Sequence, residues 1–105
     1  MHAHDRFYGV PVNDIWREVE RMYGKTVPSY EIMELLLDVV QCIKAKMPEC
    51  SVFTATEIEG VDVVVTICRV VDGVFWNLVR ERGSDEFSAR VRAIAAAMQD
   101  GYIPV

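Results

Sequence analysis

The Asp72-Gly73 pair constrains the fold more strongly than any other feature of the chain. It separates two strand-like runs, residues 61–71 and 74–81, and the first of these is strongly β-branched. A type I′ turn needs positive φ at both central residues, so an Asp-Gly pair between two such runs predicts a β-hairpin. A third run, residues 51–58, ends at Glu59-Gly60, which predicts a second turn. The three runs together predict an antiparallel meander.

Helical patterns lie on both sides of this meander. Apolar residues recur at helical spacing after Asn13, which is the expected N-cap of a first helix. A second pattern begins at the expected cap Ser29, ends near Met47 and is apolar around most of its circumference, which predicts the central helix of the fold. The last pattern follows Ser84, its expected N-cap.

These elements predict an α+β fold with the order α-α-β-β-β-α, in which helices pack on a three-stranded antiparallel meander. The 105 residues fit a single domain, 1–105, with an irregular N-terminal lead-in over residues 1–12. Hydrophobic residues make up 51% of the chain, which is enough for a packed core.

A two-residue loop at Asp72-Gly73 also predicts the register of the hairpin. The expected pairs are Val71 with Val74, Val70 with Phe75, Arg69 with Trp76, Cys68 with Asn77, Ile67 with Leu78 and Thr66 with Val79. A similar loop at Glu59-Gly60 would pair Ile58 with Val61. It would also set Glu57 against Asp62, and this like-charge pair weakens the prediction for that turn.

This register predicts two faces of the sheet. The first is the more apolar face and is expected to receive the helices; it contains Val52, Thr54, Thr56, Ile58, Val61, Val63, Val65, Ile67, Val74, Trp76 and Leu78. The second contains Phe53, Ala55, Val64, Thr66, Cys68, Val70, Phe75, Asn77 and Val79 and is too apolar for a face that meets water. Either the last helix or a terminal segment covers it, or it binds a partner or a second copy.

Charge and cysteine content exclude several classes of function. The net charge is −5 and is spread evenly along the chain, with no stripe of Lys and Arg of the kind that binds nucleic acid directly. No apolar segment is long enough to span a membrane, and the first residues lack the apolar stretch of a signal peptide. The three cysteines have irregular spacing, which indicates reduced thiols and a cytoplasmic protein.

The chain shows no convincing catalytic or metal-binding motif. Its only histidines, His2 and His4, lie beside Asp5 in a terminal segment and could hold an ion only loosely. Cys68, on the middle strand, is interpreted as an inert buried thiol. We therefore expect no catalytic residues, no metal and no cofactor, although a small enzyme with an unrecognised site stays an alternative.

Eight residues are the candidates for binding a protein partner. Glu31, Glu34 and Asp38 form an acidic stripe along the second helix, whereas Phe53, Arg69, Val70, Phe75 and Trp76 lie on the sheet. Tryptophan and arginine are frequent in interface hot spots, and the Arg69–Trp76 pair has this chemistry, although such pairs are often structural.

The functional prediction is a non-enzymatic protein-binding module. Its most specific form is a small acidic inhibitor or regulator of a nucleic-acid-handling complex, and the expected partner is a protein with a basic surface. Anti-defence proteins of phages or mobile elements, such as anti-CRISPR proteins, share this general profile of size and charge. The protein-binding module could also form a homodimer. The alternative is a homo-oligomeric structural or assembly subunit that associates through the apolar face of the sheet.

Overall fold

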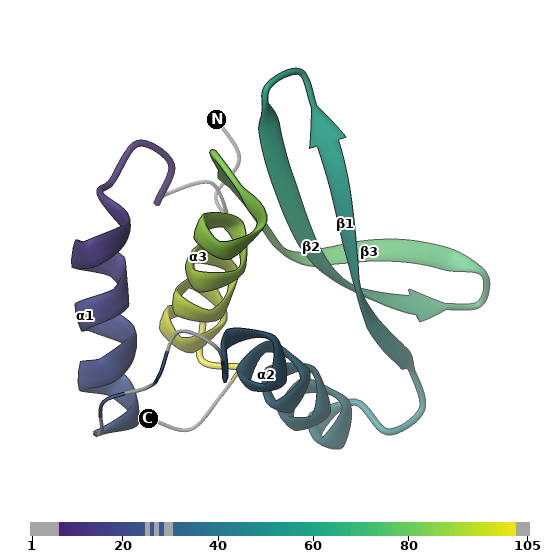
Figure 1. Ribbon diagram of the computed structural model, residues 1–105. Coiled ribbons are helices and arrows are strands. Elements are labelled where there is room, and N and C mark those ends of the chain that lie inside the picture. Colours follow the sequence, from purple (N-terminus) through teal and green to yellow (C-terminus); the bar gives the residue numbers. More distant parts are fainter. Residues whose placement is uncertain (1–6, 25, 27, 29–30, 103–105) are drawn as a thin grey trace.

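The computed structural model has the predicted α+β fold, and it describes residues 7–24, 26, 28 and 31–102 (Figure 1). Two helices precede a three-stranded antiparallel meander of order β1-β2-β3, and a third helix follows it. The elements are α1 (Val12–Tyr23), α2 (Ile32–Lys46), β1 (Ser51–Glu59), β2 (Asp62–Val71), β3 (Val74–Gly83) and α3 (Glu86–Gln99).

The turn between β2 and β3 is the one that the sequence predicts. Asp72 has a φ of 51° and Gly73 a φ of 77°, as a type I′ turn requires. Four of the expected cross-strand pairs are confirmed, from Val71 with Val74 to Cys68 with Asn77.

Beyond these four pairs a β-bulge changes the register. Ile67 pairs with Val79 and Thr66 with Arg80, so the predicted pairs Ile67–Leu78 and Thr66–Val79 are wrong. Leu78 is the extra residue, and Leu78 and Val79 both belong to the buried core against the helices. Val79 therefore lies on the first face of the sheet, not on the second face as predicted. A turn specifies the strand pairs next to it, but it cannot specify the pairs that lie beyond a bulge.

The turn between β1 and β2 differs from the prediction by one residue. Its two loop residues are Gly60 and Val61, because Glu59 pairs with Asp62 and Ile58 with Val63. Gly60 has a φ of 63°, whereas no positive φ is found at Val61. Glycine at the first central position is what a type II′ turn needs, and Gly60 occupies that position. The expected pair of Glu57 with Asp62 does not form, and Glu57 lies opposite Val64.

The central helix is α3, and the prediction that the second helix would be central is wrong. Figure 1 shows α3 between the other two helices and the strands. It contacts α1, α2, β2 and β3. Its side chains are buried almost without interruption from Ser88 to Met98. Five of them are alanines, which let neighbouring elements approach from several sides: Ala89, Ala93, Ala95, Ala96 and Ala97. On α2, by contrast, Met33 and Leu37 are 41% and 49% exposed.

Two of the expected N-caps lie one or two residues away from the observed ones. Helix α1 begins at Val12 with Pro11 at its N-cap, so Asn13 is already inside the helix. Helix α3 begins after Asp85, whose carboxylate accepts a hydrogen bond from the Ser88 backbone N–H at 2.7 Å. Ser84 is therefore not the cap. The expected cap Ser29 lies outside the described residues.

None of the described helices combines the length and the apolar character that a membrane span needs.

The capping contact of α3 predicts a measurable loss of stability. Asp85→Ala should lower the free energy of unfolding by about 1 kcal/mol, because the Ser88 N–H loses its partner and the helix dipole loses a nearby carboxylate. Ser84→Ala is the matched control and should change stability by only a few tenths of a kcal/mol, roughly. Urea unfolding followed by circular dichroism measures both; equal effects would contradict the assignment of the cap.

Candidate functional site

The sheet ends in an exposed aromatic surface at the Asp72-Gly73 turn. On the second face, Phe53 and Phe75 are 37% and 65% exposed, and their rings meet edge to face with centroids 5.9 Å apart. Val70 pairs with Phe75 and is half-buried beside it. On the first face, Trp76 is 53% exposed. We call Phe53, Val70, Phe75 and Trp76 the aromatic end.

The predicted pairing of Arg69 with Trp76 is confirmed, and it places Arg69 beside the aromatic end. The guanidinium of Arg69 is directed toward the last turn of α2, where Nη1 lies 3.8 Å from the Met47 sulfur. Arg69 is half-buried in this position. It therefore connects the β2–β3 hairpin to the end of α2 on the first face, beside Trp76.

The acidic stripe on α2 lies apart from the aromatic end. Glu34 and Asp38 are exposed and Glu31 is half-buried at the start of the helix. The aromatic end approaches α2 at Met47, and the helical rise puts Glu34 roughly 20 Å from that point. The structure thus places the five candidates on the sheet at the same end of it but on both faces. Phe53, Val70 and Phe75 lie on the second face, and Arg69 and Trp76 lie on the first. The three acidic candidates form a separate surface.

Acids outnumber bases by a larger ratio among the exposed side chains than in the whole chain, which has 16 acids and 11 bases. Among the described residues, eight exposed side chains are acidic and four are basic. The acids are Asp14, Glu34, Asp38, Glu49, Glu57, Asp72, Asp85 and Glu86, and the bases are Arg17, Arg21, Lys44 and Lys46. The lysines of this set each donate to a backbone carbonyl, Lys44 to Cys50 and Lys46 to Gly101. Arginines on the sheet are half-buried in internal contacts, so the acids dominate the outer surface.

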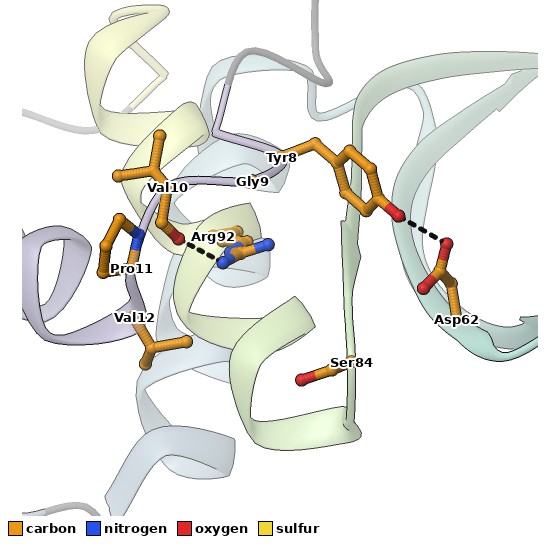
Figure 2. Close-up of a pocket in the computed structure, with 8 residues that line it drawn as sticks. All are labelled: Tyr8, Gly9, Val10, Pro11, Val12, Asp62, Ser84 and Arg92. Carbon is orange, nitrogen blue, oxygen red and sulfur yellow. Dashed lines mark hydrogen bonds between the residues drawn. The ribbon is translucent and has the colours of Figure 1, made fainter.

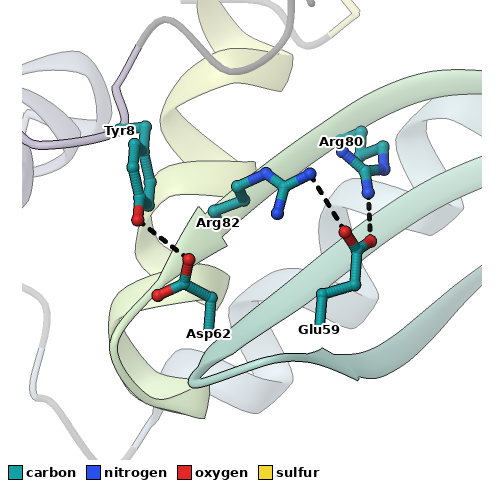
Figure 3. A network of polar contacts seen from close by, with 5 residues as sticks. All are labelled: Tyr8, Glu59, Asp62, Arg80 and Arg82. Atoms are coloured by element: carbon teal, nitrogen blue, oxygen red, sulfur yellow. Dashed lines mark hydrogen bonds and ion pairs between the residues drawn. The ribbon is translucent and has the colours of Figure 1, made fainter.

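A network of ion pairs occupies the opposite end of the second face (Figure 3). Glu59 accepts a hydrogen bond from Arg80 and lies 3.1 Å from Arg82 Nη2. Nearby, the Tyr8 hydroxyl donates to Asp62 at 2.8 Å. Because the bulge at Leu78 turns Arg80 and Arg82 to this face, these contacts depend on it. The contacts of Glu59 with Arg80 and Arg82 connect β1 to β3 across β2. The hydrogen bond between Tyr8 and Asp62 connects the N-terminal segment to the sheet.

The charges of this network shift two pKa values. Burial would raise the pKa of Glu59, but the hydrogen bond and positive charge of Arg80, together with those of Arg82, outweigh it and lower the pKa. The pKa of Tyr8 is raised by its hydrogen bond to Asp62 and by the negative charge of that carboxylate.

An open hollow of about 460 Å³ lies between the N-terminal segment and the start of α3 (Figure 2). It is lined by Tyr8, Gly9, Val10, Pro11, Val12, Asp62, Ser84 and Arg92. Arg92 donates to the Val10 carbonyl and, at 3.0 Å, to the Arg82 carbonyl. These contacts join the N-terminal segment to α3 and the end of β3, so the polar groups here hold chain segments together.

Two buried charged residues near this hollow, Glu81 and Arg92, are not predicted from the sequence. Glu81 is fully buried, and its Oε1 accepts a hydrogen bond from the Phe7 N–H at 3.4 Å. Arg92 is 7% exposed; desolvation lowers its pKa, and the negative charge of Glu81 acts in the opposite sense. The one signal in the sequence is the position of Arg92 directly before a run of small apolar residues.

The structure describes Cys68 but not the histidines that the sequence offers as metal ligands. Cys68 is 4% exposed and burial raises the pKa of its thiol, in agreement with an unreactive side chain. Within the described residues, no group of His, Cys, Asp and Glu has the arrangement of a metal site. His2, His4 and Asp5 lie outside these residues.

No family model, curated protein or solved structure matches the chain.

The network around Glu59 predicts a pH-dependent contribution to stability. A carboxylate whose pKa is lowered by folding stabilises the protein above its unfolded pKa, near 4.5, and this effect is lost as the pH falls through the lowered value. Glu59→Gln should therefore destabilise the protein at pH 7, and its difference from the wild type should shrink toward pH 3. Urea unfolding across this range measures the difference. Glu57→Gln, an exposed neighbour on the same strand, is the control, and a pH-independent difference for Glu59→Gln would contradict the prediction.

Proposed function

We propose that this protein is a non-enzymatic protein-binding module whose principal contact surface is the aromatic end of the sheet. The observation that carries the proposal is the exposure of Phe75 and Trp76 on the β2–β3 hairpin, which protrudes from the helical layer, with the exposed Phe53 on the neighbouring strand β1. Large aromatic side chains bury much apolar area at a low cost in conformational entropy, and they dominate the energetics of protein interfaces.

Several contacts favour a rigid surface at this position. The Phe53 and Phe75 rings contact each other edge to face. The type I′ turn fixes β3, which carries Phe75, against β2, and β2 pairs with β1, which carries Phe53. Arg69 connects the hairpin to α2 from the other face. A surface that is ordered before binding loses less conformational entropy in the complex, which favours affinity.

Surface charge favours a partner with a basic contact region. The exposed acids outnumber the exposed bases by eight to four in the described part of the chain, and Glu34 and Asp38 lie on the outer side of α2 beside the exposed Met33 and Leu37. A basic region is typical of proteins that handle nucleic acid. We therefore propose a regulator or inhibitor of a nucleic-acid-handling complex, of the anti-defence type that phages or mobile elements use.

Substitution of the aromatic end tests the binding surface. Phe75→Glu should weaken binding to the partner at least ~30-fold, the loss expected when a hot spot worth about 2 kcal/mol is removed. Val61→Glu is the matched control, because Val61 is 92% exposed at the tip of the other hairpin. Affinity purification from the native host identifies the partner, and calorimetry with purified partner, including candidate CRISPR nuclease complexes, measures affinity. Equal binding by both variants would overturn the proposed surface.

A charge reversal tests the nature of the partner separately. Glu31→Lys, Glu34→Lys and Asp38→Lys together should reduce binding and weaken its dependence on salt, because attraction to a basic surface is screened by ions. Asp14→Lys, on the exposed side of α1, is a control for charge change elsewhere. Unchanged affinity of the triple variant would eliminate a basic partner at α2 while leaving the aromatic end untouched.

A further inference from the structure

Strand β1 forms an open edge that contains no lysine, no proline and no bulge. It pairs with β2 without interruption over nine residue pairs, and no other described element pairs with its outer side. Natural edge strands are commonly protected by lysine, proline, a bulge or a covering helix. The other edge, β3, has both a bulge and the packing of α3. β1 contacts α2 and carries Glu57 and Glu59, but its pairing with β2 has no bulge, and no helix or strand of the described residues pairs with its outer side.

The turn at Gly60-Val61 determines which backbone groups this edge presents. A two-residue loop is closed by hydrogen bonding between its flanking residues, Glu59 and Asp62. Residues of an antiparallel strand alternate in the direction of their N–H and C=O groups, so every second residue counted from Glu59 bonds to β2. The outward groups therefore belong to Val52, Thr54, Thr56 and Ile58.

These four residues are complementary to themselves in reverse order. We infer that two copies of the chain associate through β1, antiparallel, with a two-fold axis at Ala55. In this register Val52 pairs with Ile58 of the second copy and Thr54 with its Thr56. Each pair joins β-branched side chains, which favour one another across antiparallel strands. All eight outward-facing residues of the two strands then have hydrogen-bonded partners.

In the neighbouring registers, one of the four outward-facing residues of β1 would lie opposite a residue outside the strand of the second copy. With the axis at Thr56, Val52 would lie opposite Gly60 in the turn, and with the axis at Thr54, Ile58 would lie opposite Cys50 before the strand begins. The axis at Ala55 also sets Glu57 against Phe53 of the second copy, so no acid meets an acid. It covers Ile58, which is 79% exposed in a single chain, with Val52 of the second copy.

The resulting assembly is closed. Two three-stranded sheets join at β1 into one continuous sheet, whose remaining edges are the two protected β3 strands. Of the aromatic end, Phe53 lies on β1 and would face Glu57 of the second copy, whereas Phe75 and Trp76 lie on β3, which β2 separates from this contact. The dimer does not need Phe75 or Trp76, so substitutions at these two residues test the proposed binding function separately from this inference.

Measurement of oligomeric state tests the contact. Light scattering coupled to gel filtration and sedimentation equilibrium should show a dimer of the full chain. Thr56→Pro removes an outward N–H that β2 does not use and should raise the dimer dissociation constant at least tenfold, with an unchanged circular dichroism spectrum. Phe75→Glu should leave the dimer intact. A monomer at all concentrations, or a dimer lost through Phe75→Glu and kept in Thr56→Pro, overturns the inference.

Disulfide trapping tests the register without disturbing the fold. Two Ala55 residues at the axis would form a non-hydrogen-bonded pair with Cα atoms about 4.5 Å apart, within reach of a disulfide. Ala55→Cys should therefore form a cross-linked dimer on mild oxidation. Glu57→Cys is the matched control: its two copies would be roughly 14 Å apart, given the rise per residue of a strand, and should not cross-link. The wild type controls for the three native thiols. Cross-linking of Glu57→Cys in place of Ala55→Cys would overturn the proposed register.

Discussion

The close packing around α3 is the constraint on which the rest of the structure depends. Its alanines bring two helices and the sheet against one short element, so that a nearly continuous run from Ser88 to Met98 is buried. β3 approaches the first turn of α3 so closely that a Cβ on Gly83 would lie 2.5 Å from the Ala89 backbone nitrogen. The carboxylate of Asp85 caps the helix at this junction. Since α3 completes the core, the strand that leads into it must arrive in the right orientation.

The bulge at Leu78 provides that orientation. It lets Leu78 and Val79 both face the helices, and it turns Arg80 and Arg82 to the opposite face, where they meet Glu59. It also directs Glu81 inward. One extra residue thus separates β3 into a distal part, which carries Phe75 and Trp76, and a proximal part, which joins the sheet to α3. The protruding hairpin that we propose as a binding surface is a consequence of this division.

The sequence predicted the parts of the candidate site that depend on local structure. The Asp72-Gly73 turn correctly placed Phe75 beside Val70 and Trp76 beside Arg69, because a two-residue loop specifies the pairs next to it. The same reasoning failed beyond Cys68, where tertiary packing favours a bulge. The ion pairs of Glu59 and the buried charges of Glu81 and Arg92 could not be predicted, because their partners lie on elements far apart in the chain.

By itself, the sequence determined the order of the six elements, the meander and the turn between β2 and β3, since hydrophobic periodicity and turn chemistry are properties of neighbouring residues. Only the tertiary structure decided that α3 is the central helix. An alanine-rich segment looks weakly hydrophobic in sequence, but its small side chains permit contact on every side. The choice between Glu59-Gly60 and Gly60-Val61 as the loop was also decided there. That choice determines which residues of β1 face outward. It could not be predicted from the sequence, because the register of a sheet depends on the whole network of strand pairs and contacts.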